Sequence, residues 1–293
     1  MGTDITVVVP PEASDASQLA REIIVAWDQR FSRFRADSEL SALNRAAGGS
    51  FAASEELFRA AEMAVEAARA TAGLFDPLLA MRMSELGYDR TYATLPAIGE
   101  PRPLAAWTPG RWREIVLDPE RRTIRLPADS GMDLGGLAKG MAVDAAVARL
   151  VAAGVPYAAV NAGGDLAVHG LPPGFAAWPI LVEDAGRRVV TLPHGALATS
   201  STMNRRWRVG SDRFHHLLDP RTGLPSRSDL VHATVAADSC TGAEVAAKAA
   251  LLAGRVAGEA FIEEERLAGL LVGQDGSVRR VGRWSDRDGD VSG

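Results

Sequence analysis

The most informative stretch of the chain is 132–165, which reads MDLGGLAKGMAVDAAVARLVAAGVPYAAVNAGGD. Behind its glycine-bearing start, 133–140, apolar residues recur at helical spacing, and Gly154 follows them as a helix stop. A short apolar strand is expected at 157–160, and it leads directly into 161–165. Because a helix is followed at once by a strand in this way, the stretch favours a fold that mixes helices and sheets.

The sequence on either side adds further elements of both kinds. Strands are expected at 5–9, 114–117, 123–126, 179–182, 207–209 and 231–236, helices at 54–73 and from 240 to about 258, and a hairpin around 274–276. Residues 90–112 are rich in Pro, Thr and Gly without periodicity, which indicates a loop or an exposed insertion. No repeat and no long polar linker is present, so we expect one α+β domain over 1–284 and a polar tail over 285–293.

Composition excludes several classes of protein. The 293 residues are 47% hydrophobic and 24% charged, and the single cysteine, Cys240, rules out an intramolecular disulfide. A net charge of -5 argues against a broad nucleic-acid surface but leaves a local anion pocket open. No run of about 18 apolar residues predicts membrane insertion, and the first residues lack a signal-peptide pattern, so a cytoplasmic location is expected.

Segment 133–140 has two interpretations. It is either a tight turn that needs a permissive backbone, or an anion site. In the second case Gly135 and Gly136 let backbone amides approach a phosphate, the next helix contributes its N-terminal dipole and Lys139 adds a charge. The segment matches neither the dinucleotide fingerprint nor the P-loop pattern, so it would bind an anion in another way.

Three later segments also combine small or polar residues. Segment 161–165 (Asn-Ala-Gly-Gly-Asp) permits close backbone approach at a strand end, and is equally compatible with an ordinary turn. Segment 198–202 supplies four consecutive hydroxyls, which suit phosphate oxygens, although such clusters usually belong to ordinary loops. Segment 215–223 places His216, Asp219 and Arg221 around a proline. Its plain alternative is that Asp219 caps its own turn and pairs with Arg221. Zinc-site spacing and the familiar hydrolase motifs are absent from the sequence.

Together and in this order, the motifs resemble the ApbE family, FAD:protein FMN transferases that attach FMN covalently to a Thr or Ser of an acceptor protein. The resemblance covers most of the chain. Its matching segments are 1–3, 31–34, 37–41, 43–44, 75–77, 133–140, 142–144, 161–165, 198–200 and 216–223. It implies a single T-fold-related α+β domain with mixed sheets and packed helices.

The resemblance also implies roles for individual residues. Contacts to FAD are expected at Met1, Phe34, Leu74, Phe75, Asp76, Asp133, Lys139 and His216. Catalytic roles are expected for His216 and Asp219. Ligands to Mg²⁺ are expected at Gly136, through its backbone carbonyl, and at Glu244.

The helix after Cys240 departs from the family pattern. The family has Ala-Asp-x-x-x-Thr, whereas this chain has Ala243-Glu244 followed by Lys248. Glutamate is an acceptable Mg²⁺ ligand, but an ammonium cannot coordinate a cation. Two hypotheses follow: Mg²⁺ binds with more water, or Lys248 substitutes for part of its charge. At four-residue spacing Glu244 and Lys248 could also pair with each other.

The implied reaction is attack of an acceptor hydroxyl on the FMN-side phosphorus of FAD, with AMP as leaving group and His216 positioning or deprotonating the hydroxyl. Water in place of the acceptor would give FAD hydrolysis to FMN and AMP. Binding without catalysis would make the protein a flavin-binding module.

Overall fold

The computed structural model describes residues 3–183, 188–282 and 284, which fold into two compact units. Unit 1 comprises 26–138 and 202–227, and unit 2 comprises 3–25, 139–201 and the described residues from 228 onward. Helix α1 (Ala16–Phe31) contributes residues to both. Met1 and the tail expected at 285–293 lie outside the described residues.

Unit 2 is built on a seven-stranded antiparallel sheet. Its strands in spatial order are β1 (Ile5–Val8), β5 (Ala158–Ala162), β6 (Asp165–His169), β9 (Gly195–Ser201), β14 (Leu230–Ala237), β15 (Ala268–Gly273) and β16 (Val278–Val281). A separate ribbon pairs β7 (Trp178–Val182) with β8 (Arg188–Leu192). The hairpin expected around 274–276 is present as β15–β16.

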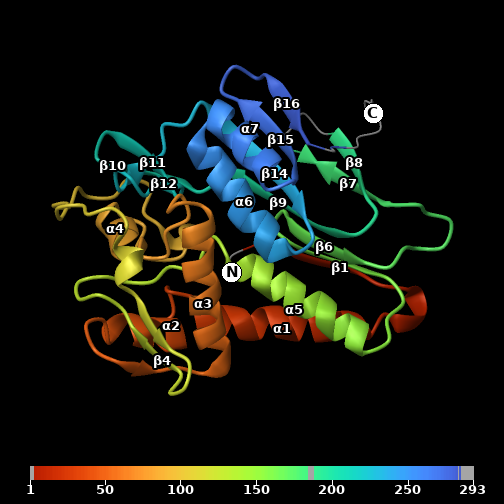
Figure 1. Cartoon of the computed structure of the whole chain (residues 1–293), viewed down its shortest axis with the longest axis horizontal. Coiled ribbons are helices and arrows are strands. Elements are labelled where there is room, and N and C mark those ends of the chain that lie inside the picture. The colour runs from red at the N-terminus through yellow and green to blue at the C-terminus, as the bar shows by residue number, and fades with distance from the viewer. Residues whose placement is uncertain (1–2, 184–187, 283, 285–293) are drawn as a thin grey trace. The chain divides into compact units, whose positions relative to one another are not determined.

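Three helices accompany this sheet: α5 (Ala138–Ala152), α6 (Cys240–Ala253) and α7 (Arg255–Glu264). Helix α6 packs across β9 and β14 and against α7, as the blue helices of Figure 1 show. Its buried residues are mostly alanine, and such small side chains allow a helix to lie close to a sheet. The helix expected to reach about 258 ends at Ala253, because Gly254 adopts a φ of +83° and redirects the chain into α7.

Unit 1 combines short helices with small sheets. Its helices are α2 (Glu39–Arg45), α3 (Glu55–Ala70) and α4 (Ala80–Glu85), and one sheet has the order β2 (Phe51–Ala52), β4 (Thr123–Arg125), β3 (Val116–Asp118). Two ribbons pair β10 (Arg206–Val209) with β11 (Asp212–His215) and β12 (Leu218–Asp219) with β13 (Leu224–Pro225). Around α4 the core contains the buried residues Leu79, Met83, Tyr88, Trp207 and Leu218.

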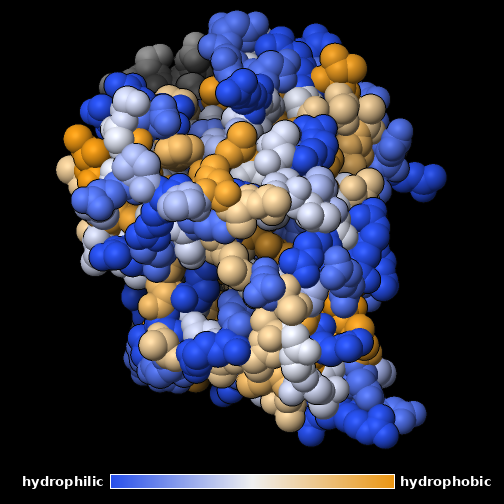
Figure 2. Space-filling model, turned by 90° about the vertical axis from the view of Figure 1, so that its left-hand side faces the viewer, coloured by the Kyte–Doolittle hydropathy of each residue, from blue (hydrophilic) through white to orange (hydrophobic). Residues whose placement is uncertain are grey.

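This mixture of helices and sheets confirms the predicted α+β class. Segment 90–112, expected to be a loop, contains a 3₁₀ turn at Tyr92–Thr94 and otherwise no regular element before Arg111. Within the described ranges, no helix has the length and apolar character needed to cross a membrane. On the face shown in Figure 2, hydrophobic residues are scattered among hydrophilic ones.

Candidate active site

A cluster of three charged side chains lies in unit 2, and we call it the Lys139 cluster. The ammonium of Lys139 donates to the carboxylate of Asp165 and, at 2.7 Å, to Oε1 of Glu244. The side chains of Asp165 and Glu244 are only 1% and 6% exposed, whereas that of Lys139 is 18% exposed. Two carboxylates and one ammonium therefore share a mostly buried site, and the ammonium has three N–H donors, two of which serve these carboxylates.

Two helix starts bring Lys139 and Glu244 together. A Cβ on Gly140 would lie 2.7 Å from backbone atoms of Cys240 and Thr241, so glycine permits the close approach of α5 and α6. The Gly140 amide donates to Oε2 of Glu244 at 2.8 Å. Asp144, one turn further along α5, accepts hydrogen bonds from the Cys240 amide and from the amide and hydroxyl of Thr241. The carboxylate of Asp144, which contacts the N-terminus of α6, also complements the dipole of that helix.

Asp165 enters the cluster from the β5–β6 hairpin. Asn161 accepts the Gly164 amide at 2.9 Å and closes the turn. Gly163 has a φ of +64°, and any side chain there would collide with Thr3. Segment 161–165 is therefore a tight turn whose last residue contributes a carboxylate to the Lys139 cluster. The sequence marked this segment for its glycines and did not single out Asp165.

The hydroxyl-rich segment 198–202 lies on and just after β9. Thr199 faces Thr234 of β14 across the sheet, and their hydroxyls are 2.9 Å apart. A cross-strand contact of this kind stabilises the sheet. The Thr199–Thr234 contact therefore supports an ordinary structural role for segment 198–202.

The predicted Mg²⁺ site does not fit these residues well. Both carboxylate oxygens of Glu244 already accept hydrogen bonds, one from an ammonium and one from a backbone amide. Among the residues that the structure describes, no three His, Cys, Asp or Glu side chains gather where they could hold a metal ion. Gly136, the other predicted ligand, belongs to unit 1. The roles of Gly136 and Glu244 as metal ligands stay predictions.

In unit 1, Asp133 is held in place by its neighbours. Its amide donates to the carbonyl of Pro77 at 2.8 Å, its Oδ1 accepts the Gly135 amide at 2.7 Å and its Oδ2 is 3.1 Å from Nε of Arg33. The Gly135 amide, which the anion-site interpretation directs at a phosphate, is therefore used within the turn. Asp133 instead presents a carboxylate with a defined orientation.

Arg33 is a further candidate site residue, which the sequence motifs did not single out. Its side chain is 8% exposed, and its guanidinium lies 4.1 Å from the ring centroid of Phe34 and 5.0 Å from that of Tyr88. The row of rings continues from Tyr88 to Trp207 at 5.1 Å. Burial raises the pKa of Tyr88. In the sequence, Arg33 is marked only by its aromatic neighbour Phe34. Such pairs are common, and they do not indicate which group the cation contacts.

Residues 74–76 are largely buried, and Phe75 and Asp76 form hydrogen bonds with neighbouring residues of the chain. Phe75 is fully buried, and its amide donates to Oγ1 of Thr71 at 2.9 Å. The buried carboxylate of Asp76 accepts the Leu78 amide at 2.8 Å. Leu74 is half-buried. The contacts to FAD expected here stay predictions.

His216 and Asp219 lie around the β12–β13 turn. The carboxylate of Asp219 accepts a hydrogen bond from the amide of Arg221 at 2.9 Å and forms an ion pair with the guanidinium of Arg221 at 2.9 Å. These are the two contacts expected if Asp219 caps its own turn. His216 is half-buried immediately before this turn. The neighbouring His215 has Nε2 3.2 Å from the carbonyl of Ser226, and burial lowers the pKa of His215. The catalytic roles of His216 and Asp219 stay predictions.

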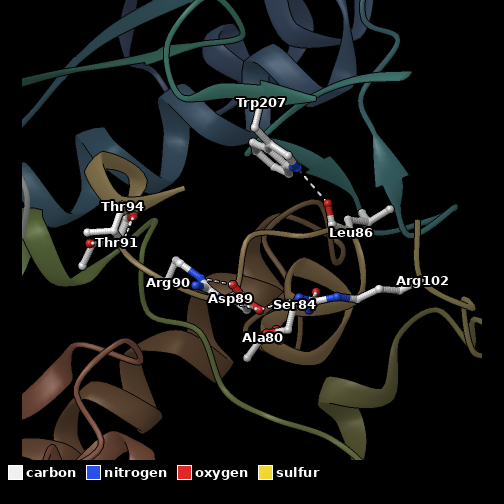
Figure 3. Close-up of polar contacts among 9 residues, drawn as sticks. All are labelled: Ala80, Ser84, Leu86, Asp89, Arg90, Thr91, Thr94, Arg102 and Trp207. Atoms are coloured by element: carbon white, nitrogen blue, oxygen red, sulfur yellow. Dashed lines mark hydrogen bonds and ion pairs between the residues drawn. The ribbon is translucent and has the colours of Figure 1, made fainter. Parts of the chain in front are cut away.

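A pocket of about 440 Å³ opens in unit 1 beside Arg33. Figure 3 shows part of its wall, where Arg102 reaches the carbonyl of Ser84 at 2.9 Å and the carboxylate of Asp89 at 2.7 Å. Hydrogen bonds from Arg90 and then from Arg102 lower the pKa of Asp89 to about 2. The charged groups in this part of the wall thus pair with one another: Asp89 binds both Arg90 and Arg102. The other polar residues of the wall are Asn44, Glu85 and Ser130.

The predicted site residues therefore fall into two groups. Lys139 and Glu244 meet in unit 2, where Asp165 joins them. Unit 1 contains Phe34, Leu74, Phe75, Asp76, Asp133, Gly136, His216 and Asp219. Met1 lies outside the described residues.

Comparison with known proteins gives a consistent result. The model of the ApbE family matches residues 1–271. A FAD:protein FMN transferase of Rhodobacter capsulatus is 33% identical over 83% of this chain and 48% of its own length. One of Treponema pallidum is 29% identical over 75% of this chain and 66% of its own length. The chain thus spans between about half and two thirds of the length of these two relatives.

Solved structures agree in fold. The crystal structure of the ApbE protein of Thermotoga maritima superposes with a TM-score of 0.83 at 24% identity, covering 96% of this chain and 94% of the other. The apo flavinyl transferase ApbE of Pseudomonas stutzeri gives a TM-score of 0.79 at 21% identity, covering 96% and 92%. At this level of identity the likeness concerns the fold.

Proposed function

We propose that this chain, which belongs to the ApbE family, transfers FMN from FAD to a Thr or Ser hydroxyl of an acceptor protein and releases AMP. The observation that carries the proposal is the family match over 1–271, together with relatives that are named FAD:protein FMN transferases. The match includes every segment that supplies a candidate site residue. A pocket of about 440 Å³ lies in unit 1 beside Arg33.

In the proposed reaction, the acceptor oxygen forms a bond to the FMN-side phosphorus, and the bond from that phosphorus to the bridging oxygen breaks. AMP leaves with the bridging oxygen, and the hydroxyl proton passes to a base. His216 is our candidate for that base or for positioning the hydroxyl. Such a transfer depends mainly on orientation and on charge stabilisation in a water-poor site.

Lys139, Asp133 and Phe34 are our candidates for binding FAD. Lys139 has one N–H left after donating to Asp165 and Glu244, and we assign it to a phosphate oxygen of FAD. Asp133, fixed by Arg33 and the Gly135 amide, would accept a hydrogen bond from FAD. Phe34 offers an aromatic face to an apolar part of the ligand.

The family resemblance also implies Mg²⁺, which would neutralise charge on the transferred phosphoryl group when bound. Because both oxygens of Glu244 are engaged by Lys139 and Gly140, we assign no step of the reaction to a metal. The positive charge at this carboxylate comes from Lys139. Asp219, paired with Arg221, is assigned to the geometry of the His216 turn.

The decisive experiment incubates the chain with FAD and with the acceptor protein of the Rhodobacter capsulatus relative. AMP release is quantified by chromatography, and the acceptor is weighed by mass spectrometry. We expect AMP in equal amount to an FMN adduct, and no adduct when the acceptor's Thr or Ser is replaced by Ala. AMP without an adduct would indicate FAD hydrolysis. Tight FAD binding with neither product would indicate a flavin-binding module, and either result would contradict the proposal.

A further inference from the structure

Residues 99–107, which we call the strap, are fixed to unit 1 by side chains and backbone. The Gly99 amide donates to the carbonyl of Arg208 at 2.8 Å, and Arg102 binds Ser84 and Asp89 as shown in Figure 3. Arg82 donates to the carbonyl of Ala105 at 2.8 Å. The strap lies in the part of the sequence expected to be a loop or insertion, and these bonds give it a defined path.

The strap ends at Trp107, which contacts the turn after His216. Its Nε1 donates to the carbonyl of Pro220 at 2.8 Å. A Cβ on Gly223, whose φ is +67°, would lie 2.6 Å from Cδ2 of the indole, so only glycine allows the ring to lie this close. On another side, the guanidinium of Arg82 is 5.1 Å from the ring centroid. The indole is therefore held between the turn and a buried cation.

The turn itself is short and closed by local bonds. The carbonyl of Asp219 accepts the amides of Thr222 and Gly223 at 3.1 and 2.8 Å, and the carbonyl of Leu217 accepts the Ser226 amide at 2.9 Å. His216 precedes the buried residue Leu217. These hydrogen bonds close the backbone between Leu217 and Ser226, which includes Pro220, and Leu217 follows His216 directly. A shift of the Pro220 carbonyl would therefore also move His216.

We propose that Trp107 is a positioning residue that fixes His216 through the Pro220–Gly223 turn. This inference rests on the proposed function, because His216 matters only if it acts on the acceptor hydroxyl. In this assignment Trp107 acts on the turn and not on the reacting atoms. It sets the place from which the imidazole can reach a proton, and small displacements of such a group reduce turnover strongly.

The test replaces Trp107 with Phe, which removes the bond to Pro220 and retains an aromatic ring. Turnover in AMP release should fall about tenfold, with the KM for FAD changed by less than about twofold, since Trp107 is assigned to the position of His216 and not to a contact with FAD. Trp107→Leu, which also removes the ring, should lower turnover further. If the Leu variant does not fold, the Phe variant still decides the question.

A matched control is Trp178→Phe in unit 2. Trp178 also donates from Nε1 to a backbone carbonyl at 2.8 Å, that of Gly170, so the two variants lose the same kind of bond. The Trp178 variant should lose stability and retain wild-type turnover. Equal turnover losses in both variants would overturn the inference.

The decisive readout combines Trp107→Phe with His216→Asn. If Trp107 acts through His216, the Trp107 substitution should have no further effect on turnover in the His216→Asn background. Independent, multiplicative losses would overturn the inference, as would normal turnover of the single Trp107 variant. A wild-type chain that releases no AMP would instead overturn the proposed function, so the two failures are distinguishable.

Discussion

Replacing Lys139 with Met should destabilise the protein strongly. The ammonium contacts two carboxylates, Asp165 and Glu244, which are 1% and 6% exposed. Removing one partner of a buried ion pair costs about 3–5 kcal/mol, because the remaining charge stays buried without compensation. Methionine fills most of the space of the aliphatic chain, so a cavity contributes little. We therefore expect the free energy of unfolding to fall by about 3–5 kcal/mol.

Urea denaturation followed by tryptophan fluorescence measures this loss. Arg149→Met is the control, because it removes one positive charge from an exposed position on the same helix and should cost no more than about 1 kcal/mol. Adding Glu244→Gln to Lys139→Met removes one of the two stranded charges and should recover part of the stability. A Lys139→Met chain as stable as the control, or a double variant less stable than the single one, would refute the reasoning.

Three further predictions concern the same units. Asp144→Asn should lower the free energy of unfolding by about 1–2 kcal/mol in urea denaturation, because one charged acceptor of three hydrogen bonds at the start of α6 is lost; an unchanged midpoint would contradict this. The lowered pKa of His215 means that the unfolded chain binds more protons just below its ordinary pKa of about 6.5, so stability should fall as pH drops through that range, and less steeply in His215→Asn; parallel stability curves would exclude this role. EDTA should leave AMP release unchanged in the wild type and in Lys248→Thr, because Lys139 occupies Glu244 in both; chelator-sensitive activity of the wild type would argue for a metal at Glu244.

Local patterns predicted much of the secondary structure because they report on contacts within a few residues. The helix expected to begin near Ser54 is α3, and the Ser54 hydroxyl accepts the Leu57 amide as its cap. The strand at 231–236 and the hairpin at 274–276 were predicted from alternation and turn residues and are present. The self-capped turn at Asp219 follows from side-chain to backbone bonds two residues apart. The helix end at Gly254 was missed because an isolated glycine is compatible with either outcome.

The sequence by itself thus determined the α+β class, most elements and, through ordered motifs, the family. Only the tertiary structure decided which charged groups meet. Lys139 and Glu244 are 105 residues apart and come together because Gly140 lets α5 approach the start of α6. Asp165 joins them through the pairing of β5 with β6, and Trp107 reaches Pro220 across 113 residues. Helical and strand periodicities report on neighbours along one element, whereas these contacts depend on sheet order and on the close packing of small residues between elements.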